Sequence, residues 1–290
     1  MHLRLKSYAK LNLYLEVLNK RKDNYHNIIS LFERIDLSDT LIFTPRRDNL
    51  IKVHSTSKDI PLDSSNLVCR SAALLQRRFK ISRGVNIRIL KRIPVGAGMG
   101  GGSSNAAYTL LGLNRFWKLG LSVLELSRLA GGIGSDVAFF VHECRFALGS
   151  GRGEKIKALG TLKKVSYWHL IVVPKLKVST PLIYDKWSKF SRLTMPGSNV
   201  KMLCSVINNK NPDLLKDMLR NDLEPVTFSL YPKIKRVKDE LKRLGAKAVL
   251  MSGSGSSVFA VVKNKEQARI LYKKLKMLHE SWLVFIARTV

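Results

Sequence analysis

A glycine-rich segment, residues 93–107, has the residue types and spacing to bind phosphate. Five glycines fall within seven residues, from Gly96 to Gly102, and Ser103 and Ser104 follow them. Glycines lack the Cβ atom that would keep a ligand away from the backbone amides, and they allow positive φ. We expect one of the two serines to cap a helix, and the free amides and dipole at a helix start attract anions. The segment therefore predicts a loop that holds a nucleotide triphosphate.

The residues on either side must place this loop between a strand and a helix. Apolar residues alternate before the loop and recur at helical spacing after it. The strand positions are Val85, Ile87 and Ile89, and the helix positions are Ala106, Leu110, Leu113 and Trp117.

Three other interpretations of the glycines are weaker. Gly96, Gly98 and Gly101 match the dinucleotide fingerprint, which needs an acidic residue after a second strand about 20 residues on. Residues 119–129 have a helical pattern instead. A Walker A loop is excluded, because no glycine-lysine pair precedes a serine or threonine. A flexible linker fits poorly, since such linkers do not usually open into an amphipathic helix.

Two charged residues lie where they could take part in proton transfer. Alternate small and apolar residues from Leu3 to Val17 predict a long strand with Lys10 on its other face, between tyrosines. A lysine in that setting is usually a solvated edge residue. Asp136 stands between a Gly-Ser pair and an apolar run, where partial desolvation could make its carboxylate a useful base. Helix capping or turn formation is the ordinary alternative for Asp136.

Other local signals divide the chain near residue 155. Residues 63–66 mark a helix start, and Ser122 with Glu125 forms a capping box. A second glycine and serine turn, residues 252–256, follows a strand pattern and precedes another. With a helix over 265–278 and a closing strand over 282–290, these strands predict a β-β-α-β unit. Taken by itself, the turn is most simply interpreted as a hairpin loop.

The composition is that of a globular protein with an unusual charge. Among 290 residues, 51 Lys and Arg against 21 Asp and Glu give a formal net charge of +30, which suits polyanionic ligands. Nucleic-acid binding is a minor alternative, because the basic residues are spread through amphipathic helices where they would face solvent. Cys69, Cys144 and Cys204 show no pairing pattern, and no run of about 18 apolar residues occurs. We therefore expect a cytoplasmic protein with no disulfide framework, no cysteine-based metal site and no membrane span.

Three features in a defined order resemble the GHMP kinase superfamily: the basic amino-terminal strand, the glycine-rich loop and the late Gly-Ser-Gly turn. Six stretches are further similar to the 4-diphosphocytidyl-2-C-methyl-D-erythritol kinase family within it, and the similarity extends over nearly the whole chain. These stretches are residues 7–15, 24–26, 65–68, 134–137, 179–184 and 251–255.

The resemblance implies an α+β fold of two domains. A ribosomal-protein-S5-like N-terminal domain, residues 1–155, would bind ATP, and a ferredoxin-like C-terminal domain would span residues 156–290, with a last strand that could return to the first domain. The implied activity is that of an ATP-dependent small-molecule kinase, which phosphorylates the 2-hydroxyl of 4-diphosphocytidyl-2-C-methyl-D-erythritol in the non-mevalonate route to isoprenoid precursors. Mg²⁺ is expected to assist, as in phosphoryl transfer generally, although no acidic cluster in the sequence marks its ligands. The implied partners are these small molecules rather than a membrane, and the oligomeric state is open.

The resemblance also implies roles for individual residues. Asp136 matches the family's catalytic carboxylate and Lys10 its catalytic lysine. The implied ATP-binding residues are Asn66, Lys91, Pro94, Val95, Gly96, Ala97, Gly98, Met99, Gly100, Gly101, Gly102, Ser103, Ser104, Ser252, Gly253, Ser254 and Gly255. The implied residues around the cytidine diphosphate are Asn12, Tyr25, His26, Thr180 and Tyr184. We expect cytosine to stack between Tyr25 and Tyr184 while His26 bonds its polar edge.

The chain departs from the family pattern at Ala97, Met99 and Ala138, where glycine, leucine and proline are more usual. A methyl group at residue 97 restricts the backbone without obstructing it, so phosphate binding is still expected. Two alternatives stay open. One is a GHMP kinase for homoserine, mevalonate, phosphomevalonate or a sugar, and the other is a nucleic-acid-binding protein on a catalytically idle fold.

Overall fold

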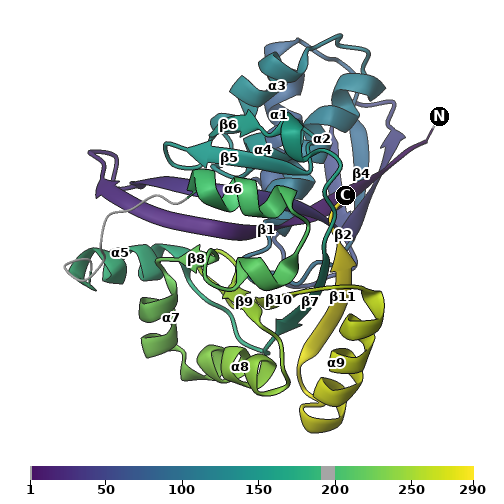
Figure 1. The fold of residues 1–290 in the computed structure, drawn as a ribbon. Helices are drawn as coiled ribbons and strands as arrows, with labels where there is room; N and C mark the ends of the chain where they lie inside the picture. Colours follow the sequence, from purple (N-terminus) through teal and green to yellow (C-terminus); the bar gives the residue numbers. More distant parts are fainter. Residues whose placement is uncertain (1, 191–199) are drawn as a thin grey trace.

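The computed structural model describes residues 2–190 and 200–290, which form two sheets with helices packed on them (Figure 1). The larger sheet has seven strands within those residues, in the order β3-β4-β2-β1-β8, with β5 and β6 continuing from β2. Its strands are β1 (Leu3–Lys20), β2 (His26–Pro45), β3 (Ile51–Ser55), β4 (Val85–Leu90), β5 (Phe146–Ser150), β6 (Lys155–Ala158) and β8 (Arg220–Asn221). Most of its pairings are antiparallel, which excludes the Rossmann interpretation of the glycines.

The antiparallel hairpin of β1 and β2 lies at the centre of this sheet. The predicted strand is confirmed, but the expectation that the face with Lys10 is solvated is wrong. Lys10 is 4% exposed and Asn12 is 2% exposed, because the glycine-rich loop covers this face: the Lys10 amide donates to the Met99 carbonyl at 3.1 Å. Register shifts at Tyr8/Ala9 and at Asn12/Tyr14 flank Lys10, and irregularities of this kind change the direction of side chains.

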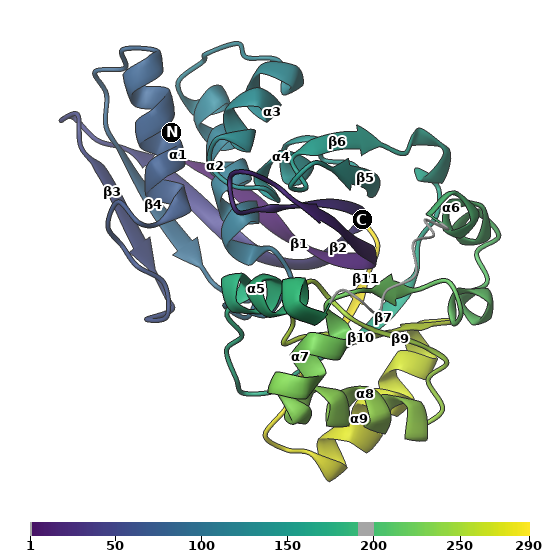
Figure 2. The ribbon, with the colours of Figure 1, turned by 90° about the vertical axis from the view of Figure 1, so that its left-hand side faces the viewer.

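The larger sheet is covered by α1 (Leu67–Arg78), α2 (Gly101–Phe116) and α4 (Val137–Val141), and α3 (Val123–Gly131) packs on α2 and α4. Figure 2 shows α1, α2 and α3 together on one side of it. The predicted helix starts at Asn66 and at the Ser122–Glu125 capping box are confirmed: the Asn66 side chain accepts a hydrogen bond from the Val68 amide, and both bonds of the box are present.

The predicted serine cap of α2 is wrong. Gly100 is the N-cap residue, with φ of 67°, and the helix begins at Gly101. A residue with a side chain rarely adopts this left-handed conformation, so the glycine allows the helix to start earlier than the serines suggest. Ser103 and Ser104 consequently lie inside the first turn.

The smaller sheet has the order β11-β7-β10-β9, and all of its pairs are antiparallel. Its strands are β7 (Trp168–Val173), β9 (Ala248–Met251), β10 (Val258–Val262) and β11 (Leu283–Arg288), and α8 (Pro232–Arg243) and α9 (Lys265–Leu278) pack on one face. The predicted β-β-α-β unit is confirmed by β9, β10, α9 and β11. The other helices of the second half are α5 (Thr180–Phe190), α6 (Val200–Asn208) and α7 (Glu224–Leu230), with short 3₁₀ turns at Gly160–Leu162 and Pro212–Leu215.

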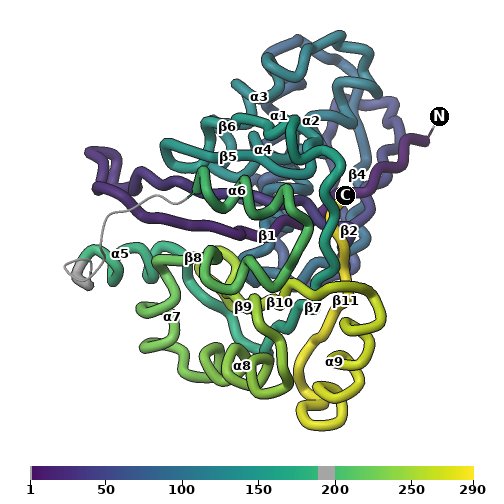
Figure 3. The backbone as a smooth tube through the Cα atoms, viewed as in Figure 1, coloured from purple at the N-terminus to yellow at the C-terminus, as the bar shows by residue number. Residues whose placement is uncertain are grey.

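A shared hydrophobic core joins the two sheets. Leu11 and Ile35 of the larger sheet pack with Ile171 and Phe259 of the smaller one and with Leu203 of α6. The strand β8 pairs with β1, and a bridge between Thr289 and Ile35 brings the C-terminus beside β2 (Figure 3). The domain division at residues 155 and 156 stays a prediction. None of the helices in the described residues is long and apolar enough to cross a bilayer.

Candidate active site

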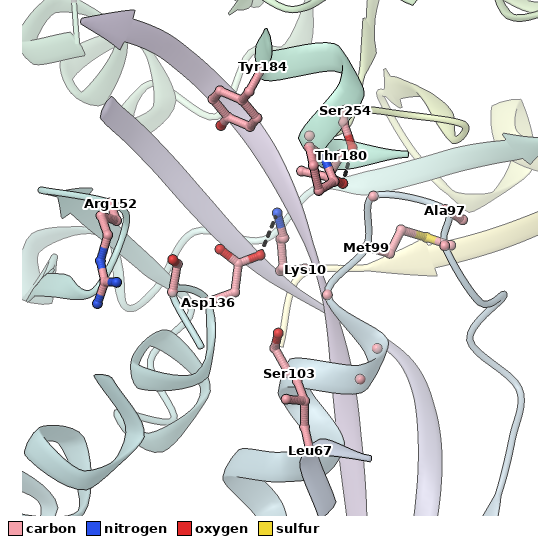
Figure 4. A pocket seen from close by; sticks show the side chains of 18 of the residues that line it. Lys10, Leu67, Ala97, Met99, Ser103, Asp136, Arg152, Thr180, Tyr184 and Ser254 are labelled. Atoms are coloured by element: carbon pink, nitrogen blue, oxygen red, sulfur yellow. Dashed lines mark hydrogen bonds and ion pairs between the residues drawn. The ribbon is translucent and has the colours of Figure 1, made fainter. Parts of the chain in front are cut away.

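A cavity of about 890 Å³ lies where the β1–β2 hairpin, the glycine-rich loop, the start of α4 and the start of α5 meet (Figure 4). Nearly all of the predicted site residues line it, including Lys10 and Asp136. Three do not, namely Ser104, Ser252 and Gly255. Residues far apart in the chain are therefore brought together around one space, while their roles toward ligands stay predictions.

Lys10 and Asp136 form an ion pair inside the cavity. The Lys10 Nζ lies 3.2 Å from the Asp136 Oδ2, and Figure 4 shows the pair pointing into the same space. Lys10 Nζ also donates to Asn12 Oδ1 and lies 5.3 Å from the centre of the Phe32 ring. The lysine side chain is 5% exposed and the aspartate side chain 28%. The ammonium group is therefore buried among protein groups, whereas the carboxylate stays accessible. This arrangement leaves Asp136 free to contact a ligand hydroxyl.

Helix capping does not account for Asp136. The residue occupies the N-cap position of α4, but its side chain makes no capping hydrogen bond. The carboxylate lines the cavity instead, so the capping alternative is wrong. The alternative of turn formation is confirmed for the backbone, since the Val137 amide donates to the Gly134 carbonyl at 3.1 Å.

The glycine-rich loop has the backbone expected of a phosphate-binding loop. Gly96, Gly98 and Gly100 have φ of 69°, 75° and 67°, and residues with a Cβ atom rarely adopt such values. A Cβ atom added to Gly102 would have no neighbouring atom within 4 Å, so the start of α2 is open to a ligand. The first amides of a helix have no partner within the helix, and the first residues of α2, Gly101, Gly102 and Ser103, line the cavity. Their chemistry suits phosphate oxygens.

The two departures from the family pattern within this loop point away from the cavity centre. Ala97 and Met99 are 2% and 1% exposed and belong to the core shared by the two sheets. Their main chains hold the loop in place: the Ala97 carbonyl accepts from the Ser257 amide, and the Met99 carbonyl accepts from the Lys10 amide. These side chains leave the phosphate side of the loop unobstructed.

The second glycine turn packs against the first, so its simplest interpretation as a plain hairpin loop is incomplete. Ser252 is fully buried, and its hydroxyl donates to the Gly98 carbonyl at 3.0 Å and accepts from the Asn12 amide at 3.2 Å. A Cβ atom on Gly98 would overlap the Ser252 carbonyl oxygen. Ser252 thus holds the glycine-rich loop on the side away from the cavity, while Gly253 and Ser254 line the cavity.

Several predicted ligand-binding side chains already have protein partners. Asn66 caps α1 and donates to the Pro61 carbonyl. Lys91 forms a buried ion pair with Asp39. The Thr180 hydroxyl shares a hydrogen bond of 2.7 Å with Ser254. These residues line the cavity, and their present bonds also fix the elements around it.

An aromatic group forms the far end of the cavity. Tyr25 is 53% exposed, whereas His26 is 5% exposed and stacks on Tyr184 with ring centroids 5.5 Å apart. His26 Nε2 bonds to the Ser188 hydroxyl, but its buried Nδ1 has no partner in the described residues. Burial, and then the charge of Lys20, lower the pKa of His26 below its ordinary value, so the ring is neutral at neutral pH.

Arg152 lines the cavity and was not predicted from the sequence. Its guanidinium lies 5.0 Å from the Tyr25 ring centre, and its buried Nε has no partner in the part of the chain that the structure describes. The residue sits in the tight turn between β5 and β6, where Gly151 and Gly153 have positive φ. An arginine between two glycines is the only sequence signal that could have indicated it.

The cavity also suits Mg²⁺, which binds few protein oxygens when phosphates and water supply the rest of its shell. The Ser103 hydroxyl and the Asp136 carboxylate point toward the part of the cavity next to Lys10 (Figure 4). Across residues 2–190 and 200–290 no group of three or more His, Cys, Asp or Glu side chains could hold a metal alone. Any Mg²⁺ here would depend on the phosphates of a nucleotide.

Comparisons with known proteins agree with this geometry. The GHMP kinases N terminal domain model matches residues 66–143, and the GHMP kinases C terminal model matches residues 205–278. A protein from Bacillus cereus (strain B4264) named 4-diphosphocytidyl-2-C-methyl-D-erythritol kinase is 43% identical over 276 residues, which are 95% of this chain and 93% of that protein. One of the same name from Bacillus mycoides (strain KBAB4) is 42% identical over the same shares of both chains.

Solved structures show the same fold. The crystal structure of a 4-(cytidine 5'-diphospho)-2C-methyl-D-erythritol kinase has a TM-score of 0.82 and 31% identity, and the match covers 99% of this chain and 100% of that one. Homoserine kinase from Cytophaga hutchinsonii has a TM-score of 0.74 at 18% identity, over 100% of this chain and 94% of that one. The mevalonate kinase of Methanococcus jannaschii has a TM-score of 0.73 at 17% identity, over 100% and 99%. The last two matches bear on the fold alone.

Proposed function

The chain belongs to the 4-diphosphocytidyl-2-C-methyl-D-erythritol kinase family of the GHMP kinases, and from this membership we propose that it transfers the γ-phosphoryl group of ATP to the 2-hydroxyl of 4-diphosphocytidyl-2-C-methyl-D-erythritol. The reaction is a step of the non-mevalonate route to isoprenoid precursors. The observation that carries the proposal is the Lys10–Asp136 pair, at 3.2 Å, beside a loop whose open amides suit phosphate. A cytoplasmic location is part of the same proposal.

Asp136 is the base of the proposed reaction. As the acceptor oxygen bonds to the γ-phosphorus and the bond from that phosphorus to the ADP oxygen breaks, the hydroxyl proton passes to the accessible carboxylate. Lys10 balances the charge of Asp136 and offsets negative charge on the transferred group. Its contacts with Asn12 and Phe32 hold the ammonium in place before the substrates bind.

The glycine-rich loop and the start of α2 are proposed to hold the triphosphate. The alternate glycines with positive φ line the cavity, so their backbone amides are near the space proposed for the phosphates, and Ser103 adds a hydroxyl. Mg²⁺ would neutralise phosphate charge when bound, and Ser103 and Asp136 are the residues that would hold it. Asn66 and Lys91 mark the side of the cavity proposed for the adenosine.

The aromatic end is proposed to hold the cytidine. Tyr25 offers an exposed face and Tyr184 a half-buried one, and His26, which lines the cavity beside them, suits the polar edge of cytosine. Arg152 lies against Tyr25 and lines the cavity, and its guanidinium charge suits the diphosphate between the base and the acceptor hydroxyl. Thr180 and Asn12 line the space between these ends.

Phosphorus NMR of the reaction products tests the proposed reaction. With ATP, Mg²⁺ and the cytidyl substrate, we expect one new phosphomonoester signal for each ADP formed, with the cytidyl diphosphate signals retained. Loss of those diphosphate signals, or ADP formation with no new monoester, would contradict phosphorylation of the acceptor hydroxyl.

A further inference from the structure

A buried aspartate lies behind the glycine-rich loop and has no part in the chemistry described so far. Asp39 is on β2, is fully buried and does not line the cavity. Isolated buried carboxylates are strongly unfavourable, so one of this kind must be fully bonded by its surroundings. The partners of Asp39 show what it does.

Four donors surround the Asp39 carboxylate. Its Oδ1 accepts hydrogen bonds from the backbone amides of Arg92 and Ile93 at 2.7 and 2.8 Å. Its Oδ2 accepts from the Asn105 side chain at 2.9 Å and pairs with the Lys91 ammonium, which is also buried. Every donor comes from one of two short segments, residues 91–93 and residue 105.

These two segments are the two ends of the glycine-rich loop. Residues 91–93 lead directly into Pro94, and Asn105 is the fifth residue of α2, just after Ser103 and Ser104. One carboxylate therefore ties the entrance of the loop to its exit. The loop needs such an anchor because its five glycines give it little rigidity of its own.

The same network reaches the strand that carries Lys10. The Asn105 Nδ2 also donates to the Ser7 hydroxyl at 2.9 Å, and that hydroxyl shares a bond of 2.8 Å with Ser104. Ser7 lies three residues before Lys10 on β1. Bonds that converge on Asp39 therefore help to set the position of the loop relative to Lys10, together with the direct bond from the Lys10 amide to the Met99 carbonyl.

We propose that Asp39 is a positioning residue for phosphoryl transfer: its carboxylate holds the two ends of the phosphate loop and sets the loop against the Lys10 strand. This rests on the proposed function only in taking the loop as the triphosphate site. Asparagine could replace Oδ1, but its amide nitrogen would face the Lys91 ammonium and the Asn105 amide, which are both donors. The bonds to Lys91 and Asn105 would then be lost, which releases the exit of the loop, whereas the amides of Arg92 and Ile93 would still hold its entrance.

Calorimetric binding of nucleotides to Asp39→Asn tests this role. We expect the affinity for ADP with Mg²⁺ to fall about tenfold to a hundredfold. The affinity for adenosine should fall much less, because on its side of the cavity only Lys91 loses a partner, and the affinity for cytidine diphosphate should stay within about twofold. The KM for ATP should rise more than kcat falls. Equal losses for ADP, adenosine and cytidine diphosphate, or no loss at all, would overturn the proposal.

Glu33→Gln is the matched control for a general effect on stability. Glu33 lies on the same strand, is fully buried, and bonds to His169 and Thr289 rather than to the loop. Its substitution should lower the free energy of unfolding without changing ADP affinity. A similar loss of ADP affinity in both variants would make Asp39 a structural residue only.

Asn105→Ala provides a second variant if Asp39→Asn does not fold. It removes the exit bond but leaves the amides of Arg92 and Ile93 on Asp39, and it should weaken ADP binding while sparing adenosine. Unchanged ADP affinity in this variant would overturn the proposal. If the wild type binds ADP yet phosphorylates another acceptor, the proposed function fails while the role of Asp39 stands.

Discussion

Lys10 and Asp136 carry the proposed chemistry at the scale of the residue, and a substitution at each separates their roles. Asp136→Asn preserves the shape but removes the base, so kcat should fall at least about a hundredfold. Lys10→Met removes the charge and should also lower kcat, since the transferred group loses its cation. Initial rates of ADP release measure both. An Asp136→Asn turnover within about tenfold of wild type would rule out the base, and unchanged turnover in Lys10→Met would rule out the cation.

Tyr25 and Arg152 touch each other, yet they are expected to serve different parts of the acceptor. Tyr25→Ala removes a stacking face, so it should weaken cytidine and cytidine diphosphate equally, by about tenfold. Arg152→Gln removes the guanidinium with its charge and its donors, and it should weaken the diphosphate while sparing cytidine. Titration calorimetry with both ligands measures this, and ATP affinity serves as the control. Equal effects of Arg152→Gln on the two ligands would show that it acts through the Tyr25 ring.

His26 gives the protein a predictable pH dependence. Burial lowers the pKa of its ring below 6.5, so at mildly acidic pH the unfolded chain binds a proton that the folded chain does not. The free energy of unfolding should therefore fall as pH drops from 6.5 toward the lowered pKa, and this contribution is constant above 6.5. Urea unfolding from about pH 7 to 5 should show a steeper fall for wild type than for His26→Gln. Identical slopes would contradict the expected contribution of His26.

At the scale of the element, the glycine-rich loop depends on close contact with the second glycine turn. Gly98→Ala would push a methyl group onto the Ser252 carbonyl oxygen and strain a φ of 75°, so it should destabilise the fold by about 1–3 kcal/mol. Gly102→Ala is the control, because a Cβ there meets nothing within 4 Å and lies in a helix. Urea unfolding should show a loss for Gly98→Ala and no loss for Gly102→Ala. Equal effects would mean that the contact between the two turns is unimportant for stability.

The sequence predicted this loop and its following helix because glycine spacing and apolar periodicity are local properties. It failed on the helix cap, since a glycine at positive φ leaves no side-chain signal comparable to a serine. Nor could it show that Ser252 lies behind Gly98, because that contact joins residues 154 positions apart. Contacts of this kind are created only when the two sheets pack together.

At the scale of the whole molecule, packing of the two sheets turns scattered residues into one site. The strand with Lys10 was recognisable from alternation, but its pattern alone favoured a solvated lysine. Burial of Lys10 depends on the loop that covers β1 and on Asp136 at the start of α4. Resemblance to the kinase family, rather than periodicity, identified the pair in advance. The resemblance included neither Asp39 nor Arg152, whose partners become clear only in three dimensions.

The net charge of +30 also belongs to the whole molecule. It raises the local concentration of two anionic substrates and so favours their association. None of the described contacts gives it a more specific role.

The most direct test of the account is the acceptor specificity of the enzyme. We would measure kcat/KM with ATP and Mg²⁺ for 4-diphosphocytidyl-2-C-methyl-D-erythritol, homoserine, mevalonate, phosphomevalonate and galactose, each beside an Asp136→Asn control. We predict activity confined to the cytidyl compound and lost in the control. Comparable activity on another acceptor would contradict the cytidine site at Tyr25, His26 and Tyr184, and activity on none of the five would contradict the proposed kinase function.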